Sequence, residues 1–147
     1  MLPYLKNIYL AEDDSDDVFI FKYALKRLGL NCRITVFPNG QELLDKLQNI
    51  NIFPDIIFLD INMPKLNGLD TLVQIKEMES FHSTPVIVYS TSNNNIDAIK
   101  ALEGRASLYL VKPNNIDELT KMLVKILSLN WKSYNTPNRL DEFILKP

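Results

Sequence analysis

Acidic side chains stand at two places where a short apolar run ends. Glu12 and Asp13 follow the run that ends at Ala11, and Asp60 follows the Ile-Ile-Phe-Leu run that ends at Leu59. If the two runs are neighbouring strands of a parallel sheet, their carboxyl ends lie together and the three carboxylates converge. Such carboxylates repel one another unless a cation neutralises them. An all-oxygen ligand set of this kind suits Mg²⁺, or Mn²⁺ in its place, and no His or Cys is near enough in sequence to indicate zinc.

Two further apolar runs end in side chains that suit a phosphate group. The run 86–89 is followed by Ser90 and Thr91, and the run 108–111 is followed by Lys112. A metal ion and a lysine ammonium neutralise phosphoryl oxygens, and a hydroxyl can hydrogen-bond to one of them. An Asp can accept the phosphoryl group as an aspartyl phosphate. These strand ends together predict a phosphoryl-transfer site.

The elements that must position these residues alternate along the chain. Apolar runs predict strands at 7–11, 33–37, 56–59, 86–89 and 108–111, and helical spacing of apolar residues predicts helices at 16–28, 41–47, 69–78, 96–102 and 116–129. Five strand-then-helix units predict an α/β fold, a (βα)5 doubly wound parallel five-stranded sheet. The strand order 2-1-3-4-5 places its switch point between the first and third strands, where the three carboxylates fall.

Composition narrows the class of protein. The chain has 147 residues, 46% of them apolar and 23% charged, which is ordinary for one globular domain. One cysteine, no apolar run of membrane-spanning length and no signal-like start favour a cytoplasmic protein without a membrane partner. Five of the 18 acids lie between positions 12 and 17, and no stripe of Lys and Arg indicates direct nucleic-acid binding.

Four motifs in order resemble those of response-regulator receiver domains of two-component signalling. They are Leu-Ala-Glu-Asp-Asp at 10–14, Phe-Leu-Asp-Ile-Asn-Met-Pro at 58–64 with Gly68 following, Pro-Val-Ile-Val-Tyr-Ser-Thr at 85–91 and Tyr-Leu-Val-Lys-Pro at 109–113. The resemblance covers residues 6 to 128 or so and implies the flavodoxin-like, CheY-like fold. We therefore expect a receiver domain at 1–129 and a C-terminal tail at 130–147 that is too short to be a domain.

The resemblance also implies a role for each residue of the metal site. Asp13 would bind Mg²⁺ directly, and Glu12 would hold it through a water molecule. Asp60 would be a ligand, and Asn62 would contribute its backbone carbonyl.

The resemblance further implies the phosphorylation and switch residues. Asp60 would be the phosphoacceptor, and Lys112 would pair with a phosphoryl oxygen. Ser90 would be the switch hydroxyl that turns toward the phosphoryl group, and Tyr109 the aromatic whose rotamer follows it. The Lys112–Pro113 peptide bond would be cis, an expectation that depends on the resemblance alone.

The function implied is that of a stand-alone response regulator rather than an enzyme with turnover. A sensor histidine kinase or phosphotransfer protein would supply the phosphoryl group, which Asp60 would accept and slowly lose. An unknown downstream protein would read the result on a surface between about residues 96 and 127. Two alternatives stay open, a degenerate receiver that binds without phosphorylation and a phosphohydrolase with an Asp nucleophile. The second lacks the general acid of haloacid-dehalogenase phosphatases, because Asn62 stands in that place.

Three interpretations of the tail stay open. It mixes apolar residues such as Trp131, Tyr134 and Phe143 with polar ones and Pro137. It could dock on the body of the protein, serve as an interaction or dimerisation arm, which keeps a homodimer open, or lack order.

Overall fold

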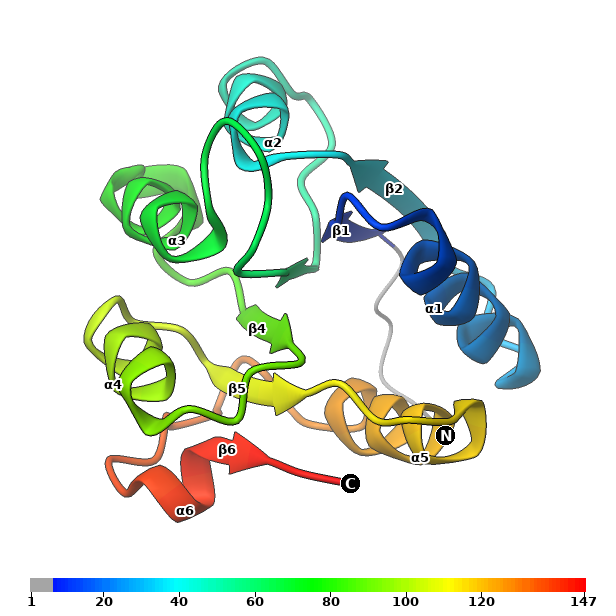
Figure 1. Ribbon diagram of the computed structural model, residues 1–147. Helices are drawn as coiled ribbons and strands as arrows, with labels where there is room; N and C mark the ends of the chain where they lie inside the picture. The colour runs from blue at the N-terminus through cyan, green and yellow to red at the C-terminus, as the bar shows by residue number, and fades with distance from the viewer. Residues whose placement is uncertain (1–6) are drawn as a thin grey trace.

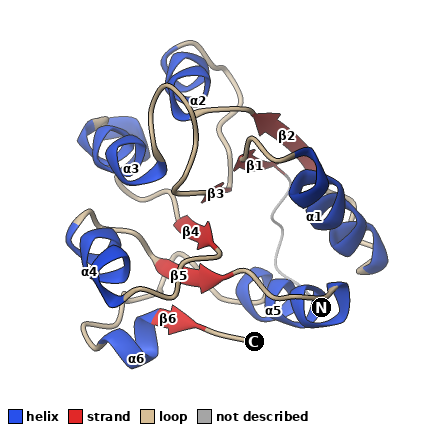
Figure 2. Ribbon diagram, in the orientation of Figure 1, coloured by secondary structure: helices blue, strands red, loops and turns tan. Residues whose placement is uncertain are grey.

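The computed structural model describes residues 7–147 and arranges them as one parallel sheet between two layers of helices (Figure 1). The strands are β1 Asn7–Ala11, β2 Arg33–Phe37, β3 Ile56–Leu59, β4 Val86–Ser90, β5 Leu108–Val111 and β6 Ile144–Leu145. The helices are α1 Ser15–Arg27, α2 Gly40–Gln48, α3 Gly68–Glu77, the short 3-10 helix η1 Glu79–Phe81, α4 Asn95–Glu103, α5 Ile116–Leu127 and α6 Leu140–Phe143. Figure 2 shows the strands between the helices in the same view. The predicted α/β class is confirmed.

The strand order is β2-β1-β3-β4-β5-β6, and every neighbouring pair is parallel. The predicted order 2-1-3-4-5 is therefore confirmed for the first five strands. In the β1–β3 pair Ala11 is in register with Leu59, so the residues that follow each strand emerge side by side. This register brings Glu12 next to Asp60.

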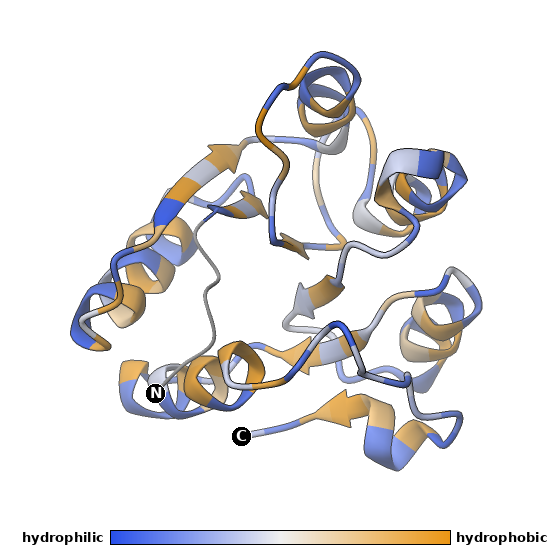
Figure 3. Ribbon diagram, turned by 180° about the vertical axis from the view of Figure 1, so that it is seen from behind, coloured by the Kyte–Doolittle hydropathy of each residue, from blue (hydrophilic) through white to orange (hydrophobic). Residues whose placement is uncertain are grey.

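The strands form a sheet because their side chains are buried on both faces. Ile8 and Leu10 of β1 point into the core beneath α1 and α5, while Tyr9 and Ala11 point to the opposite side. That second core is covered by α2, α3, α4 and α6, with Phe143 of α6 in it. Figure 3, coloured by hydropathy, agrees with this burial: the strands are mainly hydrophobic, and the helices carry both hydrophobic and hydrophilic residues.

Asp or Asn caps all five helices that follow the first five strands. The caps are Asp14, Asn39, Asn67, Asn94 and Asn115, and the side chain of each accepts a hydrogen bond from a backbone N–H of the first turn. With these caps, the helices α1 to α4 begin one residue before their predicted starts, and α5 begins at its predicted start. The loops between the strand ends and these caps contain Glu12, Asp13, Asp60 and Lys112.

The tail adds an element that the sequence did not predict. Five strands were expected, but β6 pairs with the outer side of β5, with Ile144 in register with Tyr109. The two residues of β6 are too few to produce a recognisable apolar pattern. The preceding helix α6 contacts α4 and buries Phe143 completely, so the tail packs on the body of the protein.

No helix within residues 7–147 is both long and apolar enough to cross a membrane.

Replacing Phe143 by Ala tests how much the tail contributes to stability. The side chain is fully buried among residues of the second core, so its loss leaves a cavity. We expect the free energy of unfolding to fall by about 3 kcal/mol, measured by urea denaturation. Phe19→Ala is the matched control because Phe19 is 68% exposed, and it should cost no more than about 0.5 kcal/mol. Equal effects of the two substitutions would contradict the docked tail.

Candidate functional site

The acidic cluster lies at the carboxyl ends of β1 and β3, the topological switch point of the sheet. Carboxylate oxygens of Glu12, Asp13 and Asp60 lie within 4.8 Å of one another. The backbone N–H of Asp60 donates to the carbonyl of Ala11 at 3.0 Å, which fixes the loop after β3 against the end of β1. The convergence predicted from strand order is therefore present.

Two of the three carboxylates are buried. Glu12 is 2% exposed and Asp60 is 6% exposed, whereas Asp13 is open to solvent. Burial raises the pKa of Glu12 to about 7, although the Lys112 ammonium opposes the shift. Burial also raises the pKa of Asp60, and Lys112 again opposes it. A cation at this site would remove part of the cost of keeping both groups charged.

Lys112 extends from the end of β5 into the cluster. Its Nζ donates hydrogen bonds to Glu12 and to Asp17, the latter at 2.9 Å, and lies 3.7 Å from Asp60 Oδ1. It also lies 5.0 Å from the centre of the Tyr89 ring. Burial disfavours the ammonium, but the two hydrogen bonds and the Asp60 carboxylate outweigh this and raise the pKa of Lys112. Lys112 is thus a fixed positive charge among the acids.

The loop after Asp60 holds this residue closely. The backbone N–H of Ile61 donates to Asp60 Oδ1 at 2.9 Å, and the N–H of Gly68 donates to the carbonyl of Ile61 at 2.8 Å. Gly68 packs so tightly that an added Cβ would lie 2.0 Å from the carbonyl oxygen of Asp60. Asn62 follows with an exposed side chain, and its role as a backbone ligand remains a prediction.

Of the predicted switch residues, Ser90 is the last residue of β4 and Tyr109 lies within the neighbouring strand β5. Ser90 and Tyr109 are both fully buried. Ser90 Oγ accepts from the N–H of Ser92 at 3.2 Å, and the Tyr109 hydroxyl donates to the carbonyl of Ser92 at 2.7 Å. Burial raises the pKa of Tyr109, while its bond to Ser92 lowers it. Both side chains therefore contact one residue of the loop that leads to α4.

Sequence reasoning missed two contributors to the site. Asp17 lies in the first turn of α1, where an acid suits the helix dipole, yet it is also a direct partner of Lys112. Gly68 was noted only as part of a motif, although its missing side chain lets α3 approach Asp60. The run of five acids between positions 12 and 17 could have indicated a further role for Asp17, because a helix cap and a metal site together need fewer than five acids.

One expectation about the backbone is wrong. The Lys112–Pro113 bond is trans, since no peptide bond within residues 7–147 is cis. The cis form rested on the resemblance alone, and trans is the usual state of a bond before proline.

The donor set fits a hard divalent cation. The three clustered groups offer only carboxylate oxygens, and neither His nor Cys joins them among the described residues. Oxygen ligands with few carboxylates match the preference of Mg²⁺ or Mn²⁺. Asp13, Asp60 and, through water, Glu12 are the residues that would hold the ion.

Mg²⁺ should stabilise the protein through this cluster. At a concentration 100 times the dissociation constant, a ligand that binds only the folded state adds about 2.7 kcal/mol to the free energy of unfolding. We expect thermal unfolding of the wild type to shift upward with Mg²⁺ and the shift to be largely lost in Asp13→Asn. Asp16→Asn, which removes an exposed acid with the same change in charge, should keep the shift. An equal response of the two variants would contradict the metal site.

Gly68→Ala should disturb the site through the backbone. The added methyl group meets the Asp60 carbonyl rather than a flexible side chain, so the loop must move. We expect a loss of about 2 kcal/mol in stability and weaker Mg²⁺ binding, measured by urea denaturation and calorimetric titration. Gly29→Ala is the control, since Gly29 has φ +65° with nothing within 4 Å of an added Cβ. It should cost stability but leave the affinity for Mg²⁺ unchanged.

Comparisons with known proteins agree with this geometry. The family model of the response regulator receiver domain matches residues 8–124. Response regulator Rcp1 of Synechocystis sp. is 30% identical over 137 residues, which cover 90% of this chain and 93% of Rcp1. A probable methanogenesis regulatory protein, FilR2 of Methanothrix harundinacea, is 31% identical over 132 residues, 87% of this chain and 84% of FilR2.

Solved structures are similar over nearly the whole chain. The Mn²⁺-bound form of Rcp1 superposes with a TM-score of 0.76 at 30% identity, covering 90% of this chain and 99% of Rcp1. The phosphorylated cyanobacterial phytochrome response regulator RcpA gives a TM-score of 0.78 at 28% identity, covering 92% of this chain and all of RcpA, 100%. Since the family model matches most of the chain and relatives align along almost their full length, this chain belongs to the response regulator receiver domain family.

Proposed function

We propose that this protein is a phosphorylation switch that accepts a phosphoryl group on Asp60. The donor would be a phosphohistidine of a sensor histidine kinase or of a phosphotransfer protein. Family membership supports this, as does the likeness to RcpA, a response regulator solved in phosphorylated form. Such partners act in the cytoplasm, which is the compartment we propose.

The observation that carries the proposal is the pairing of Asp60 with Lys112 inside the acidic cluster. Asp60 lies within 4.8 Å of two other carboxylates and 3.7 Å from the Lys112 ammonium. Asp60 would be the nucleophile, and it would hold the cation together with the other two carboxylates. Few other functions need an ammonium, three acids and a buried hydroxyl at one end of a sheet.

The reaction moves the phosphoryl group from a histidine nitrogen to an oxygen of Asp60, so one covalent bond forms as another breaks. An oxygen of the Asp60 carboxylate attacks the phosphorus, the phosphorus–nitrogen bond of the phosphohistidine breaks, and the imidazole leaves with the electron pair. Lys112 neutralises a phosphoryl oxygen. To do so, its ammonium gives up part of its present ion pair with Glu12. When bound at Asp13, Asp60, Glu12 and the Asn62 carbonyl, Mg²⁺ supplies positive charge for the remaining oxygens.

The readout would pass through Ser90 to α4. The Ser90 hydroxyl would turn toward the new phosphoryl group and so break the hydrogen bond that the N–H of Ser92 now donates to it. Ser92 in turn holds Tyr109 through its carbonyl and Asp97 of α4 through its hydroxyl, at 2.8 Å. A change at Ser90 would therefore reach the first turn of α4 in two hydrogen bonds.

The output surface would include the exposed apolar residues of α4, which covers one face of the sheet, and of α5, which covers the other. Ile96 and Ile99 of α4 are 60% and 41% exposed, and Val124 of α5 is 38% exposed. A downstream protein that binds this surface would sense the position of α4. The protein would thus act as a signal carrier, with self-catalysed acceptance and slow loss of the phosphoryl group in place of turnover.

Intact-protein mass spectrometry after incubation with acetyl phosphate and Mg²⁺ tests the acceptor. We expect one phosphoryl adduct on the wild type and none on Asp60→Asn, because the amide is not a nucleophile for phosphorus. Chelation of the metal should also abolish the adduct.

Asp45→Asn is the matched control for this experiment. Asp45 is an exposed acid of α2 that accepts a hydrogen bond from Gln41 of the same helix, so its variant should be labelled like the wild type. Stoichiometric labelling of Asp60→Asn would contradict the assignment. Failure of the wild type to accept a phosphoryl group from acetyl phosphate or from a phosphohistidine donor would favour a binding module that does not need phosphorylation.

A further inference from the structure

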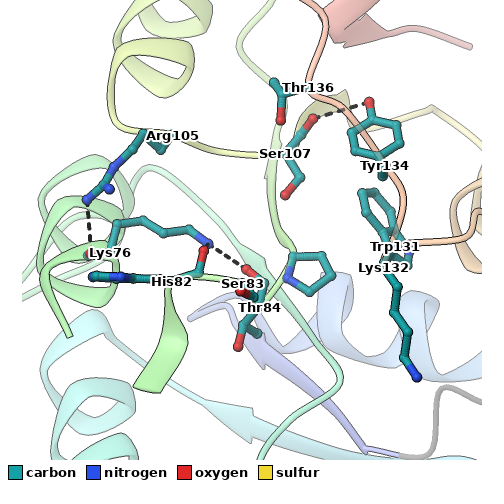
Figure 4. Close-up of a pocket in the computed structure, with 11 residues that line it drawn as sticks. Lys76, His82, Ser83, Thr84, Arg105, Ser107, Trp131, Lys132, Tyr134 and Thr136 are labelled. Atoms are coloured by element: carbon teal, nitrogen blue, oxygen red, sulfur yellow. Dashed lines mark hydrogen bonds between the residues drawn. The ribbon is translucent and has the colours of Figure 1, made fainter. Parts of the chain in front are cut away.

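A second pocket lies at the amino end of the sheet, opposite the end that carries Asp60 (Figure 4). It has a volume of about 420 Å³, and Pro85 and Ser107, which precede β4 and β5, are part of its lining. The beginning of the tail supplies one wall through Trp131 and Tyr134. The volume falls in the range of sites for small molecules.

The lining of this pocket carries positive charge without a compensating acid. Lys76, Arg105 and Lys132 contribute cations and His82 an imidazole, while no Asp or Glu lines the pocket. Within residues 7–147 none of the three cations forms an ion pair. The positive charges of Lys76, Arg105 and Lys132 are therefore available to bind an anion.

Lys76 is the unusual member of this group. The residue is 4% exposed, and among residues 7–147 its ammonium donates to three backbone carbonyls, those of Phe81, His82 and Thr84, at 3.4, 3.3 and 2.5 Å. Burial and, to a smaller extent, the nearby charge of Arg105 together lower the pKa of Lys76 to about 8. A buried ammonium beside a guanidinium is costly unless a negative charge offsets both.

Arg105 adds an independent observation. Its backbone has φ +69°, a left-handed conformation that disfavours any residue with a Cβ atom. Of its five N–H donors, one NH2 hydrogen bond to the carbonyl of Lys76 at 2.9 Å is formed within the described residues. The remaining donors can bind a ligand.

We propose that this pocket binds a small molecule that carries a phosphate group. The phosphate would lie near Lys76 and Arg105, and the organic part would extend toward Trp131 and Tyr134, which Figure 4 shows across the pocket. A phosphate monoester carries a charge of about −1.5 to −2 and so can offset two cations, whereas a carboxylate offsets only one. Because body and tail share the pocket, the ligand would hold the tail in place.

The chain offers a direct probe of this pocket. Trp131 is the only tryptophan of the sequence, so its fluorescence reports on the wall that it forms. The protein is titrated with AMP, inorganic phosphate or adenosine without Mg²⁺, with excitation at wavelengths that adenine does not absorb. We expect a saturable change with AMP, weaker binding of inorganic phosphate and no response to adenosine.

Two variants separate binding from folding. Arg105→Gln should weaken AMP binding about tenfold, because a charge-assisted contact is lost. Arg105→Gly should weaken it equally while keeping or raising the temperature of unfolding, since glycine tolerates φ +69°. Arg139→Gln is the matched control and should bind as the wild type does, because Arg139 is an exposed arginine of the tail that pairs with Asp141 at 2.8 Å.

The outcomes decide the proposal independently of the phosphorylation switch. The absence of a saturable response to AMP, an equal response to adenosine, or unchanged binding by Arg105→Gln would each overturn it. Inorganic phosphate that binds as tightly as AMP would overturn the part assigned to Trp131 and Tyr134. The titration should give the same result with Asp60→Asn, and loss of the AMP response there would assign the binding to the other end of the sheet.

Discussion

The ammonium of Lys112 is the contact on which the carboxyl end of this sheet depends. Side chains of Glu12, Asp17 and Asp60 meet it from the end of β1, from α1 and from the end of β3. Without a cation Glu12 and Asp60 would be buried together, with the half-buried Asp17 near them and nothing to offset their repulsion. That repulsion would oppose the packing that brings the three elements into contact. The arrangement thus joins stability to chemistry. A phosphoryl group or a metal ion that enters the cluster must compete with contacts that also hold the fold together.

The order of the strands was readable from sequence because parallel strands buried on both faces leave an unmistakable pattern. Ile56 to Leu59 are four apolar residues in a row, each completely buried in the structure. Once five such runs alternate with helices, the handedness of the connections leaves few topologies, and the order of the strands decides which ends meet. The carboxylates of Glu12 and Asp60 could therefore be brought together across nearly 50 positions without any knowledge of side-chain geometry.

What could not be predicted depends on contacts that leave no periodic trace. Asp17 meets Lys112 because the first turn of α1 lies beside the end of β5, a contact across 95 positions that no local pattern in the sequence indicates. The close approach of Gly68 to Asp60 is a property of two backbones and has no counterpart in hydropathy. In the tail, Phe143 carries the apolar contact, but a single buried aromatic residue does not identify a helix of four residues or a strand of two.

The pairing of β6 with β5 affects how the molecule meets other molecules. An uncovered outermost strand presents a row of unpaired N–H and C=O groups on which a strand of another chain can assemble. Here two residues, Ile144 and Leu145, occupy part of that row, and they do so at the far end of the tail, where few backbone bonds hold them. Local opening of such a segment requires much less free energy than global unfolding. The tail thus covers part of the edge of β5, and a strand of another chain could pair with Tyr109 and Leu110 only after this short segment opens.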